Sequence, residues 1–487
     1  MEVKEAKIDQ IRQHLDEIIA QVDAQSKLEL KVHQVERSLF ASLLQLGFQL
    51  LEYYILSIQT LLSVQGVPVD SEGEKMKNTG RRNRPYRSVF GQLSIARAKY
   101  YSSIDKSYYR LDEALGLPKS NYSYVLDDWL GYAATEMDFA QSTEQLERVL
   151  GHSLTAMQSQ RCSNRLSKEV DDFYGQQVWE NVEDATHLSV SFDGKGVPIR
   201  RSEAQRTQES TMVRLSKGQK KGVKKEATVT LSSSFAPRPR EAQELLECLF
   251  CPNYALQKPG EKHVWHEHKH LRAFLSDKVG AIRYGMDNLL RRDASEKKPI
   301  VILIDGDRAL EKAVRQVAGE KGIEQRIEAY VLDFIHLIEY VWKVANARWG
   351  EKHPSRLTWV RSQAALLLES QHQEVLEGWH TIILQQSTLS QYQRNTVQRA
   401  ITYLTNHQHM VDYKTYLQQG FPITTGAVES ACGHFVKSRM ERNGMHWGKQ
   451  GAQNMLNLRA VKKNGDWNEY LENLINNEQR ILYKQAA

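Results

Sequence analysis

The sequence predicts a mixed α/β chain in which one sheet is interrupted by an all-helical insertion and preceded by mostly helical regions. Three observations predict this class. Residues 187–234 carry strand patterns and residues 300–349 alternate strand with helix, the order that one mixed sheet requires. Residues 346–418 hold helical periods and no strand-like run. Residues 1–65 show the apolar stripe of amphipathic helices.

The strongest strand signal lies in Pro299–Val314, PIVILIDGDRALEKAV. Four of the five residues from Ile300 to Ile304 are β-branched and all five are apolar, which is typical of a strand buried on both faces. Asp305 follows at the carboxyl end of this strand, where open α/β sheets place their sites. Taken alone, Asp305 and Asp307 are better explained as a turn and a helix cap, and the functional interpretation depends on the partners that the chain offers to Asp305.

Composition describes a soluble globular protein with more than one domain. The chain has 487 residues, of which 41% are apolar and 25% charged, so a disordered chain is excluded. The net charge is +6. The excess of cations is concentrated in three stretches, a distribution compatible with contact to a polyanion: Lys75–Lys99, Arg200–Lys225 and Lys437–Arg442.

The cysteine count and the N-terminus indicate the compartment. Four cysteines in so long a chain predict a reducing environment without a disulfide framework. The start, MEVKEAKIDQ, lacks the apolar core of a signal peptide. The most hydrophobic window, Leu39–Val64, contains three Gln and a Glu, which favours an amphipathic helix over a membrane span. We therefore expect a soluble, cytoplasmic protein with no membrane partner.

The N-terminal half offers two candidate DNA contacts. Residues 66–84 are polar, Gly-containing and basic, as in an exposed linker able to touch phosphates. From Ser142 to Ser167 the pattern predicts a helix, a break at 151–153 and a second helix, the spacing of a helix-turn-helix whose second helix would present Arg161 and Arg165. A purely structural helix pair is an equal alternative.

The central strands are predicted in chain order. The segment HLSVSFDGKGVPI at 187–199 predicts a strand ending at Asp193, a Gly-containing turn and a return strand. Residues 200–225 would form a basic loop, and ATVTLSSS at 227–234 a further strand. Helical runs are expected from 241 to 292, and a strand to Leu332 precedes a helix.

Three carboxylates fall on elements that can converge. Asp193 ends the first strand, Asp305 ends a later buried strand, and Glu429 lies in the first turn of a predicted late helix, AVESACGHFVKSRMER. Carboxylate oxygens are the ligands that Mg²⁺ prefers. Two such ions about 3.5–4 Å apart can assist an in-line displacement at a phosphodiester. Each acid alone is also a common turn or cap residue.

These residues carry a resemblance to a known family. The segments VSFDGKGV and LIDGDRALEKAV, the pair Asp333-x-x-His336, and GAVESACGHFVKSRMERNGMHWGKQGAQNMLNLRA resemble bacterial insertion-sequence transposases of the ISKra type. That group is related to the mutator-like transposases. The resemblance covers most of the chain and implies a ribonuclease-H-like catalytic domain with a DDE triad formed by Asp193, Asp305 and Glu429.

The resemblance also implies ligands and partners. The triad would bind two Mg²⁺ (or Mn²⁺) ions. Asp333 and His336 would lie near the active site and contact DNA, although a helix cap and a core histidine is the ordinary interpretation. Further phosphate contacts are expected on the helix after Glu429, where a solvated basic face is the alternative: Lys437, Arg439 and Arg442.

The expected organisation combines both lines of argument. The regions are a helical N-terminus (1–75), a small β-unit (76–120), a helix-turn-helix-like DNA-binding region (121–180), the first part of the catalytic domain (181–345), the helical insertion (346–420), and the end of the catalytic domain with a tail (421–487). Many relatives carry paired cysteines near 100–110, but this chain has KYYSSIDKSYYR there. Cys248-x-x-Cys251 precedes clustered histidines without the regular spacing of a zinc finger. We expect no zinc.

The sequence therefore predicts a metal-dependent DNA transposase of the nucleoid. It would cleave at the terminal inverted repeats of a mobile element and join the freed 3′-hydroxyl to target DNA, acting as a homodimer or larger assembly on DNA. The alternatives are a domesticated DNA-binding protein without catalysis, and a ribonuclease-H-like nuclease that does not join strands.

Overall fold

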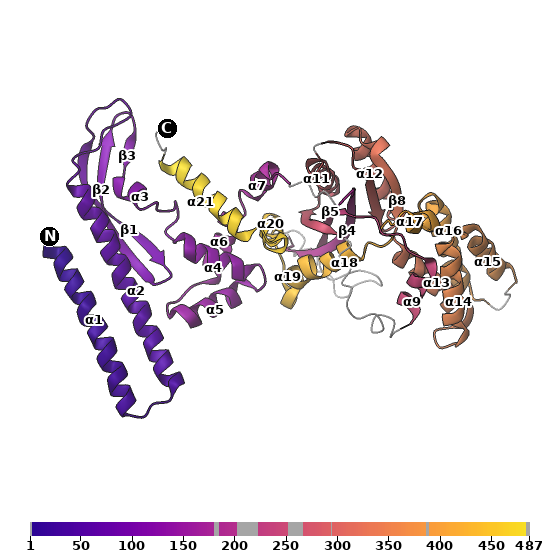
Figure 1. Ribbon diagram of the computed structural model, residues 1–487, viewed down its shortest axis with the longest axis horizontal. Helices are drawn as coiled ribbons and strands as arrows, with labels where there is room; N and C mark the ends of the chain where they lie inside the picture. Colours follow the sequence, from indigo (N-terminus) through magenta and orange to yellow (C-terminus); the bar gives the residue numbers. More distant parts are fainter. Residues whose placement is uncertain are drawn as a thin grey trace, which may run out of the picture. The chain divides into compact units, whose positions relative to one another are not determined.

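The computed structural model divides the chain into two compact units (Figure 1). Unit 1 is Met1–Tyr174 together with Asp466–Ala487, and unit 2 is Gly175–Gly465. The structure describes residues 2–179, 185–201, 223–251, 266–293, 295–385 and 389–483. It contains a three-stranded and a five-stranded sheet among many helices, so the predicted mixed α/β class is confirmed.

Unit 1 begins with a helical hairpin. Helices α1 (Glu2–Lys27) and α2 (Val32–Ser63) pack side by side (Figure 1). Polar contacts join them along their length: Lys7 Nζ lies 2.6 Å from Glu52 Oε2, and Gln25 Nε2 donates to Ser38 Oγ at 2.9 Å. Because one face of each helix stays exposed, the hairpin buries few apolar side chains.

One helix among the described residues is long and apolar enough to cross a membrane by length and composition, namely α2. Its C-terminal half packs on a sheet: Ile55 joins a cluster with Leu93 and Ile95. The helix also carries Glu52 in the ion pair to α1. These contacts favour the amphipathic interpretation of this stretch.

The sheet of unit 1 has the strand order β1-β2-β3. Its strands, all antiparallel, are β1 (Lys77–Ser88), β2 (Gly91–Ser102) and β3 (Lys106–Tyr108). The prediction that 66–84 is a linker is therefore wrong from Lys77 onward. The polar segment KNTGRRNR pairs with β2 as an edge strand. An edge strand forms backbone hydrogen bonds to only one neighbour, and it can form without a high β-propensity or an alternation of apolar residues.

The rest of unit 1 is helical. The helices are α3 (Arg110–Ala114), α4 (Tyr124–Ala134), α5 (Phe139–Leu150), α6 (Ala156–Leu166), α7 (Val170–Gln176) and α21 (Trp467–Tyr483). The predicted helix–break–helix is present: Gly151 closes α5 in the left-handed conformation, and Thr155 caps α6. The tail α21 belongs to unit 1, not to the sheet domain as expected, because its buried Tyr470 packs on Phe173.

Unit 2 is built on a sheet of order β6-β5-β4-β7-β8. The strands are β4 (His187–Ile199), β5 (Val223–Phe235), β6 (Glu267–Leu275), β7 (Ile300–Ile304) and β8 (Ile327–Leu332). Neighbours β6, β5 and β4 are antiparallel, whereas β4, β7 and β8 are parallel. Every residue of β7 is buried, as its apolar run predicts.

Two expectations for this sheet are wrong. Strand β4 continues through Asp193 to Ile199 without a turn at the glycines, because β5 pairs with it over its whole length. Strand β6 lies inside the stretch expected to be helical. The basic loop predicted for 200–225 lies for the most part outside the described residues, at 202–222, as does His263 of the excluded zinc motif.

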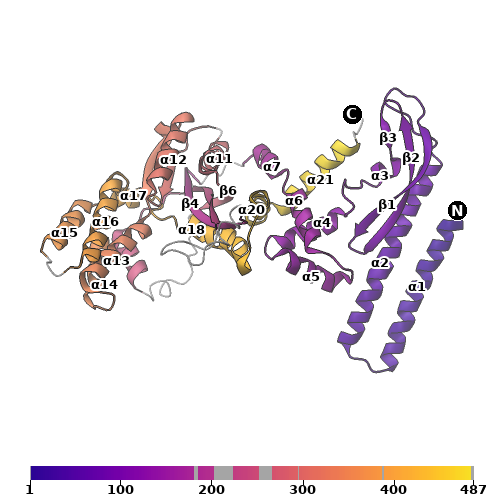
Figure 2. The same cartoon turned by 180° about the vertical axis from the view of Figure 1, so that it is seen from behind.

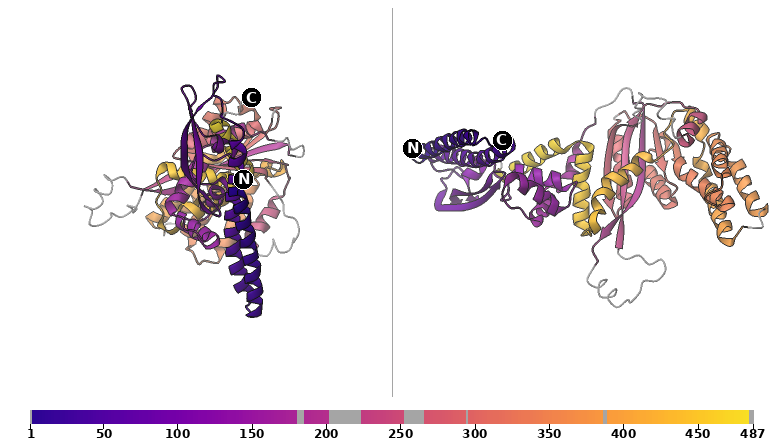
Figure 3. Two further views of the ribbon diagram at one scale, coloured as in Figure 1. Left: turned by 90° about the vertical axis from the view of Figure 1, so that its left-hand side faces the viewer. Right: turned by 90° about the horizontal axis from the view of Figure 1, so that it is seen from below.

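Helices close both faces and one edge of the sheet. Helices α9 (Ala242–Phe250), α11 (Lys278–Arg291) and α12 (Arg308–Glu320) follow the strands. Helix α20 (Lys449–Asn464) runs beside the edge strand β6 (Figure 3). Gln453 of α20 accepts from Leu275 N at 2.8 Å and donates to Ala273 O at 2.9 Å. These bonds satisfy edge groups that would otherwise lack partners.

The predicted helical insertion is present (Figure 2). It consists of α13 (Phe334–Trp349), α14 (Ser355–Leu368), α15 (His372–Gln385), α16 (Gln391–His407) and α17 (Tyr413–Gln418). Its core holds Trp379, fully buried, and is continuous with the core of the sheet. Tyr413 Oη donates to Leu332 O at 2.9 Å, which ties the insertion to the edge strand β8.

The chain around Glu429 does not form one long helix as predicted. Helix α18 (Gly426–Ala431) passes into a π-helical segment, η3 (Cys432–Lys437), and then a short α19 (Ser438–Met440). A π-turn widens a helix and changes the direction of the side chains before and after it. The buried Cys432, Phe435 and Val436 of η3 fix this segment in the unit 2 core.

Candidate functional site

The site begins with three acids in one row across adjacent parallel strands: Asp305 and Asp333 follow the ends of β7 and β8, and Asp193 lies within β4. Strands β4 and β7 pair with Ser191 opposite Leu303, so the same register places Asp193 opposite Asp305. Strands β7 and β8 pair with Ile304 opposite Leu332, which places Asp333 next in the row. Neighbouring strands lie about 4.8 Å apart. The fold therefore brings together three acids that are far apart in the sequence.

Asp305 and Asp307 differ sharply in their surroundings. Asp307 caps α12 by accepting from Ala309 N at 2.9 Å and lies 2.8 Å from Lys278 Nζ. Burial acts to raise the pKa of Asp307, but Lys278 and the backbone amides outweigh it and lower that pKa. The Asp305 carboxylate accepts from Asp307 N at 3.0 Å and, within the part of the chain that the structure describes, is not joined to a cation as Asp307 is. Of the two, Asp305 thus keeps more acceptor capacity for a ligand.

The charge around Asp305 is unbalanced. Burial raises the pKa of Asp305, and the neighbouring carboxylate of Asp193 acts in the same direction, whereas His336 and the amide of Asp307 oppose it. A half-buried carboxylate next to a second one favours either a proton or a bound cation. This pair is therefore suited to a divalent ion.

The loop after β7 is held by the helical insertion. Tyr403 of α16 donates its hydroxyl to Asp305 O at 2.9 Å and stacks on Tyr340 of α13 with ring centres 4.0 Å apart. Gly306, next in the chain, has φ +91° and lies directly under the Tyr403 ring. The insertion thereby fixes the backbone that presents Asp305.

Asp333 is fully buried, and its two oxygens already have several donors. Oδ1 accepts from the backbone amides of Ile335 and His336, as the N-cap of α13. Oδ2 accepts from the amide of Thr425 at 2.9 Å and from its hydroxyl. Although burial acts to raise it, these bonds and His336 lower the pKa of Asp333. Its geometry is that of an acid that positions its neighbours.

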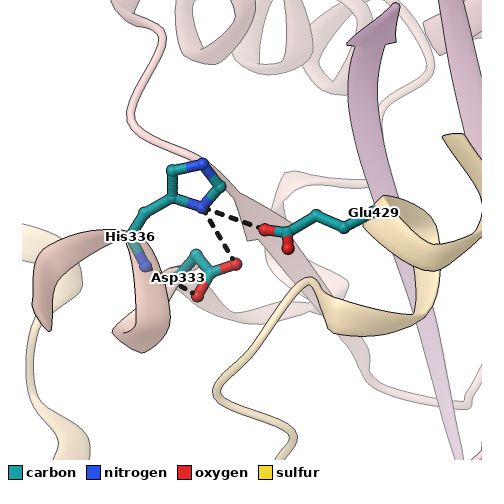
Figure 4. A group of neighbouring side chains, drawn as sticks. All are labelled: Asp333, His336 and Glu429. Carbon is teal, nitrogen blue, oxygen red and sulfur yellow. Dashed lines mark hydrogen bonds and ion pairs between the residues drawn. The ribbon is translucent and has the colours of Figure 1, made fainter. Parts of the chain in front are cut away.

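His336 connects the acids on the two sides of the site. Its Nδ1 lies 3.3 Å from Asp333 Oδ2 and 3.0 Å from Glu429 Oε1 (Figure 4). The hydrogen bond to Asp333 raises the pKa of His336 to about 9, and the charges of Glu429 and Asp305 add to this. In this state the imidazolium balances part of the carboxylate charge.

Glu429 is placed by the first turn of α18. Its Oε1 accepts from Thr425 Oγ1 at 2.9 Å, and Thr425 is bound in turn to Asp333. Burial and the charge of Asp333 raise the pKa of Glu429. One turn on, burial and a hydrogen bond to Asp193 raise the pKa of the Cys432 thiol. The segment that carries Glu429 thus touches the first acid of the row.

Ligand atoms of Asp333, His336 and Glu429 lie within 4.8 Å of one another, close enough to hold a metal ion. The bonds already made by Asp333 argue against it as a principal ligand. The carboxylates of Asp193, Asp305 and Glu429 supply hard oxygen donors. This is the donor set that magnesium prefers. The donor chemistry of these three carboxylates therefore fits a divalent cation, although among the described residues Asp193 and Asp305 are not part of the group whose ligand atoms lie within 4.8 Å.

Of the residues of unit 2 that were expected to contact DNA after Glu429, two are exposed to solvent and one is buried. Lys437 and Arg442 are exposed and stand just after the segment that holds Glu429. Arg439 is fully buried and stacks over Trp447 with its guanidinium carbon 4.8 Å from the ring centre. The prediction that Arg439 contacts phosphate is wrong, because Arg439 faces the core of unit 2 whereas Lys437 and Arg442 face solvent.

The helix pair of unit 1 is divided in the same way. Arg161 is exposed on α6. Arg165 forms a bidentate ion pair with the buried Asp127 of α4, with Nη2 2.5 Å from Oδ1 and 2.6 Å from Oδ2. Removing Arg165 from this pair would leave a buried carboxylate uncompensated, so Arg165 has a structural role within unit 1, and its contact with DNA stays a prediction. Arg161 remains available.

Sequence reasoning missed two residues of the site, Thr425 and Tyr403. Thr425 lies four residues before Glu429, and this spacing places the Thr hydroxyl to bond the Glu side chain across one helical turn. Tyr403 lies in a helix 98 residues from Asp305, and no local signal indicates that contact.

The site is an acidic cluster on the sheet of a mixed α/β fold. Residues 259–472 match the uncharacterised protein family UPF0236. The match spans β6, β7, β8, the helical insertion and the α18–α20 region, and so includes Asp305, Asp333, His336 and Glu429. A search of curated proteins finds no match.

Proposed function

We propose that this protein is a DDE-type DNA transposase in which Asp193, Asp305 and Glu429 bind two Mg²⁺ or Mn²⁺ ions. The observation that carries the proposal is the convergence of the site. Asp193 and Asp305 share one row of the sheet, and α18 brings Glu429 to the His336 that also acts on Asp305.

The architecture supports a ribonuclease-H-like catalytic domain. Three antiparallel strands continue into two parallel ones, and the acids of a DDE enzyme of this class are expected at the ends of such strands and on a later helix. The bacterial family matched by residues 259–472 is often described as transposase-related. The finer assignment, to the ISKra type related to mutator-like enzymes, rests on the sequence motifs.

The residues would divide the work of phosphodiester cleavage. Two divalent cations, when bound, would supply activation of the attacking oxygen and stabilisation of the leaving oxygen. Asp193, Asp305 and Glu429 would hold them, and the Asp333–Thr425 bonds would keep Glu429 in place. His336 supplies positive charge beside the carboxylates, where it can also meet a phosphate of the DNA.

The partners are DNA ends, target DNA and a second copy of the chain. Lys437, Arg442 and Arg161 are the exposed cations that we assign to phosphates. The hairpin α1–α2 leaves large apolar side chains exposed, including Ile19, Phe40, Leu43 and Leu50, which supports its use in pairing two protomers on DNA. With this function the protein acts in the cytoplasm, at the nucleoid.

The test uses end-labelled duplexes of the DNA that flanks the gene. We expect cleavage that frees a 3′-hydroxyl in Mg²⁺ and none in Ca²⁺. Asp193→Asn, Asp305→Asn and Glu429→Gln should each reduce the rate by about a thousandfold or more, since residues that act as a unit fail together. Asp307→Asn, which retains a capping side chain, is the matched control and should remain within a few-fold of wild type.

The products separate the alternatives. Joining of the freed 3′-end to a second duplex supports transposition. Cleavage without joining would replace it with a nuclease, and DNA binding without Mg²⁺-dependent cleavage would leave a domesticated binding protein. Equal losses for Asp305→Asn and Asp307→Asn would refute the assignment of the triad.

A further inference from the structure

The first hairpin of the unit 1 sheet carries an unusual run of charge. Between Lys75 and Ile104 the chain has eight Lys or Arg residues and no Asp or Glu. The run covers nearly all of β1 and β2. In a chain with almost as many acids as bases overall, 59 against 65, thirty residues of a single sign call for an explanation.

The structure uses three of these cations internally. Arg84 and Arg97 both pair with Asp112, Arg84 Nη1 at 2.9 Å. Arg87 donates to Ser153 O at 2.6 Å. These contacts join the sheet to neighbouring parts of unit 1, so they account for part of the charge.

Four further cations form what we call the β1 basic surface: Lys77, Arg81, Arg82 and Lys99. The first three are exposed and Lys99 is partly so. Within residues 2–179, none of the four has an acidic partner among the ion pairs of the structure. Their charge is therefore directed to solvent.

The register spreads these side chains over both faces of the ribbon. Arg81 pairs with Ala98 and Arg82 with Arg97, and successive residues of a strand point to opposite faces. Strand β1 is the free edge of its sheet. On the face of Ala98 the neighbouring β2 side chains, Ala96 and Ser94, are small, so a large partner can approach the backbone closely.

Protection of the sheet edge explains only part of this pattern. Charged residues, a proline and a bulge are the usual means of keeping an edge strand from pairing with other chains, and β1 has Pro85 and a register shift between Asn78 and Arg81. Acidic residues would protect an edge equally well. Edge protection therefore does not account for the exclusively positive sign.

We propose that the β1 basic surface binds the sugar–phosphate backbone of double-stranded DNA. The sheet has three strands, and α2 packs on its face at Leu93 and Ile95. The contact is therefore made by the exposed edge strand β1, whose cations can bind phosphates of the DNA backbone. The choice of DNA as the polyanion rests on the proposed function. The contact itself lies in unit 1, needs no metal, and is independent of the carboxylate site.

The test measures the affinity of the full-length protein for a labelled duplex in EDTA over a series of salt concentrations. Each phosphate contact contributes about 0.9 to the slope of log K against log salt. The triple variant Lys77→Ala, Arg81→Ala, Arg82→Ala should reduce that slope by about two to three and weaken binding at least tenfold. Arg81→Lys with Arg82→Lys should keep the slope.

The control removes the same charge elsewhere in unit 1. Lys27, Lys31 and Arg37 are exposed at the α1–α2 connection, and their replacement by Ala should change the slope by less than one. Equal losses in the two triple variants, or a larger loss for single-stranded RNA than for the duplex, would overturn the proposal. The binding assay in EDTA does not depend on cleavage. If the wild type fails to cleave DNA in Mg²⁺, the proposed function is refuted, but the binding result still holds.

Discussion

Gly306 is the residue at which backbone conformation and packing restrict the site most tightly. Its φ of +91° is a region that side chains avoid, and an added Cβ would lie 2.4 Å from the Tyr403 hydroxyl. We predict that Gly306→Ala lowers the free energy of unfolding of unit 2 by at least about 2 kcal/mol, since the conformational and steric costs add. Urea unfolding followed by hydrogen exchange of β7 peptides measures this change.

A second glycine separates the two costs. Gly322 also has a positive φ, +66°, but has no heavy atom within 4 Å of an added Cβ. Gly322→Ala should cost only about 1 kcal/mol. If the two variants lose the same stability, the Tyr403 contact is not as close as described, and the argument that the insertion holds the Asp305 loop fails.

Single residues show where the sequence was informative. The register that places Asp193 opposite Asp305 joins the apolar run Ile300–Ile304 to an alternating run of apolar residues and serines before Asp193, and in the sequence each run ends in an acid. Arg439 was misjudged, and the structural role of Arg165 was missed, because a basic side chain on a predicted helix gives the same sequence pattern whether it meets a phosphate or a buried partner. Only the fold reveals the Trp447 ring and the Asp127 carboxylate.

Among the elements, the π-helical η3 has the most direct bearing on the site. Arg459 of α20 is fully buried, and its Nε donates to Phe435 O at 2.6 Å while Nη2 donates to His434 O at 2.6 Å. Both acceptors belong to η3, which continues the helix of Glu429. The guanidinium therefore supports the wide turn that sets the direction of the Glu429 side chain.

We predict that Arg459→Met raises the Mg²⁺ concentration for half-maximal cleavage at least fivefold and lowers the free energy of unfolding by about 2–4 kcal/mol, because buried carbonyls lose charged donors. Arg459→Lys, which can keep one bond, should fall in between. Arg292 is also buried and bonds backbone, at His268 O of β6, but its hydrogen bonds run to α11, β5 and β6 and not to η3. Arg292→Met should lower stability without changing the Mg²⁺ dependence; a shift in both variants would contradict the role of Arg459.

Elements with a strong periodic pattern were predicted correctly, and those shaped by neighbours were not. The apolar run of β7 and the helices of the insertion are cases of the first kind. Strand β6 was missed because its two faces are both partly polar: His270 and Arg272 lie buried against Tyr284. The turn expected at the glycines after Asp193 is absent because pairing with β5 extends β4 through them.

At the scale of the whole molecule, the C-terminal tail belongs to unit 1 and not to unit 2, which precedes it in the sequence. The tail returns to the first unit: Trp467 Nε1 donates to Asp128 Oδ1 at 2.7 Å and packs edge-on against Tyr132. Tyr124 Oη donates to Glu478 Oε2 at 2.7 Å. The sequence alone assigned this polar tail to the domain that precedes it in the chain, because the sequence does not indicate which surface a C-terminal helix packs against.

The two ends of unit 1 should therefore depend on each other. We predict that ending the chain after Gly465 destabilises α4 and α6 by at least about 5 kcal/mol, because the buried side chains of Trp467, Tyr470 and Leu474 are lost and each contributes about 1.5–3 kcal/mol. Hydrogen exchange should show lost protection in α4 and α6 and unchanged protection in β4 and β7. Deleting residues 2–27, which buries only Ile18 among its apolar side chains, is the control and should leave α4 protected. Loss of protection in β7 on removal of the tail would instead place α21 with the sheet, as the sequence alone indicated.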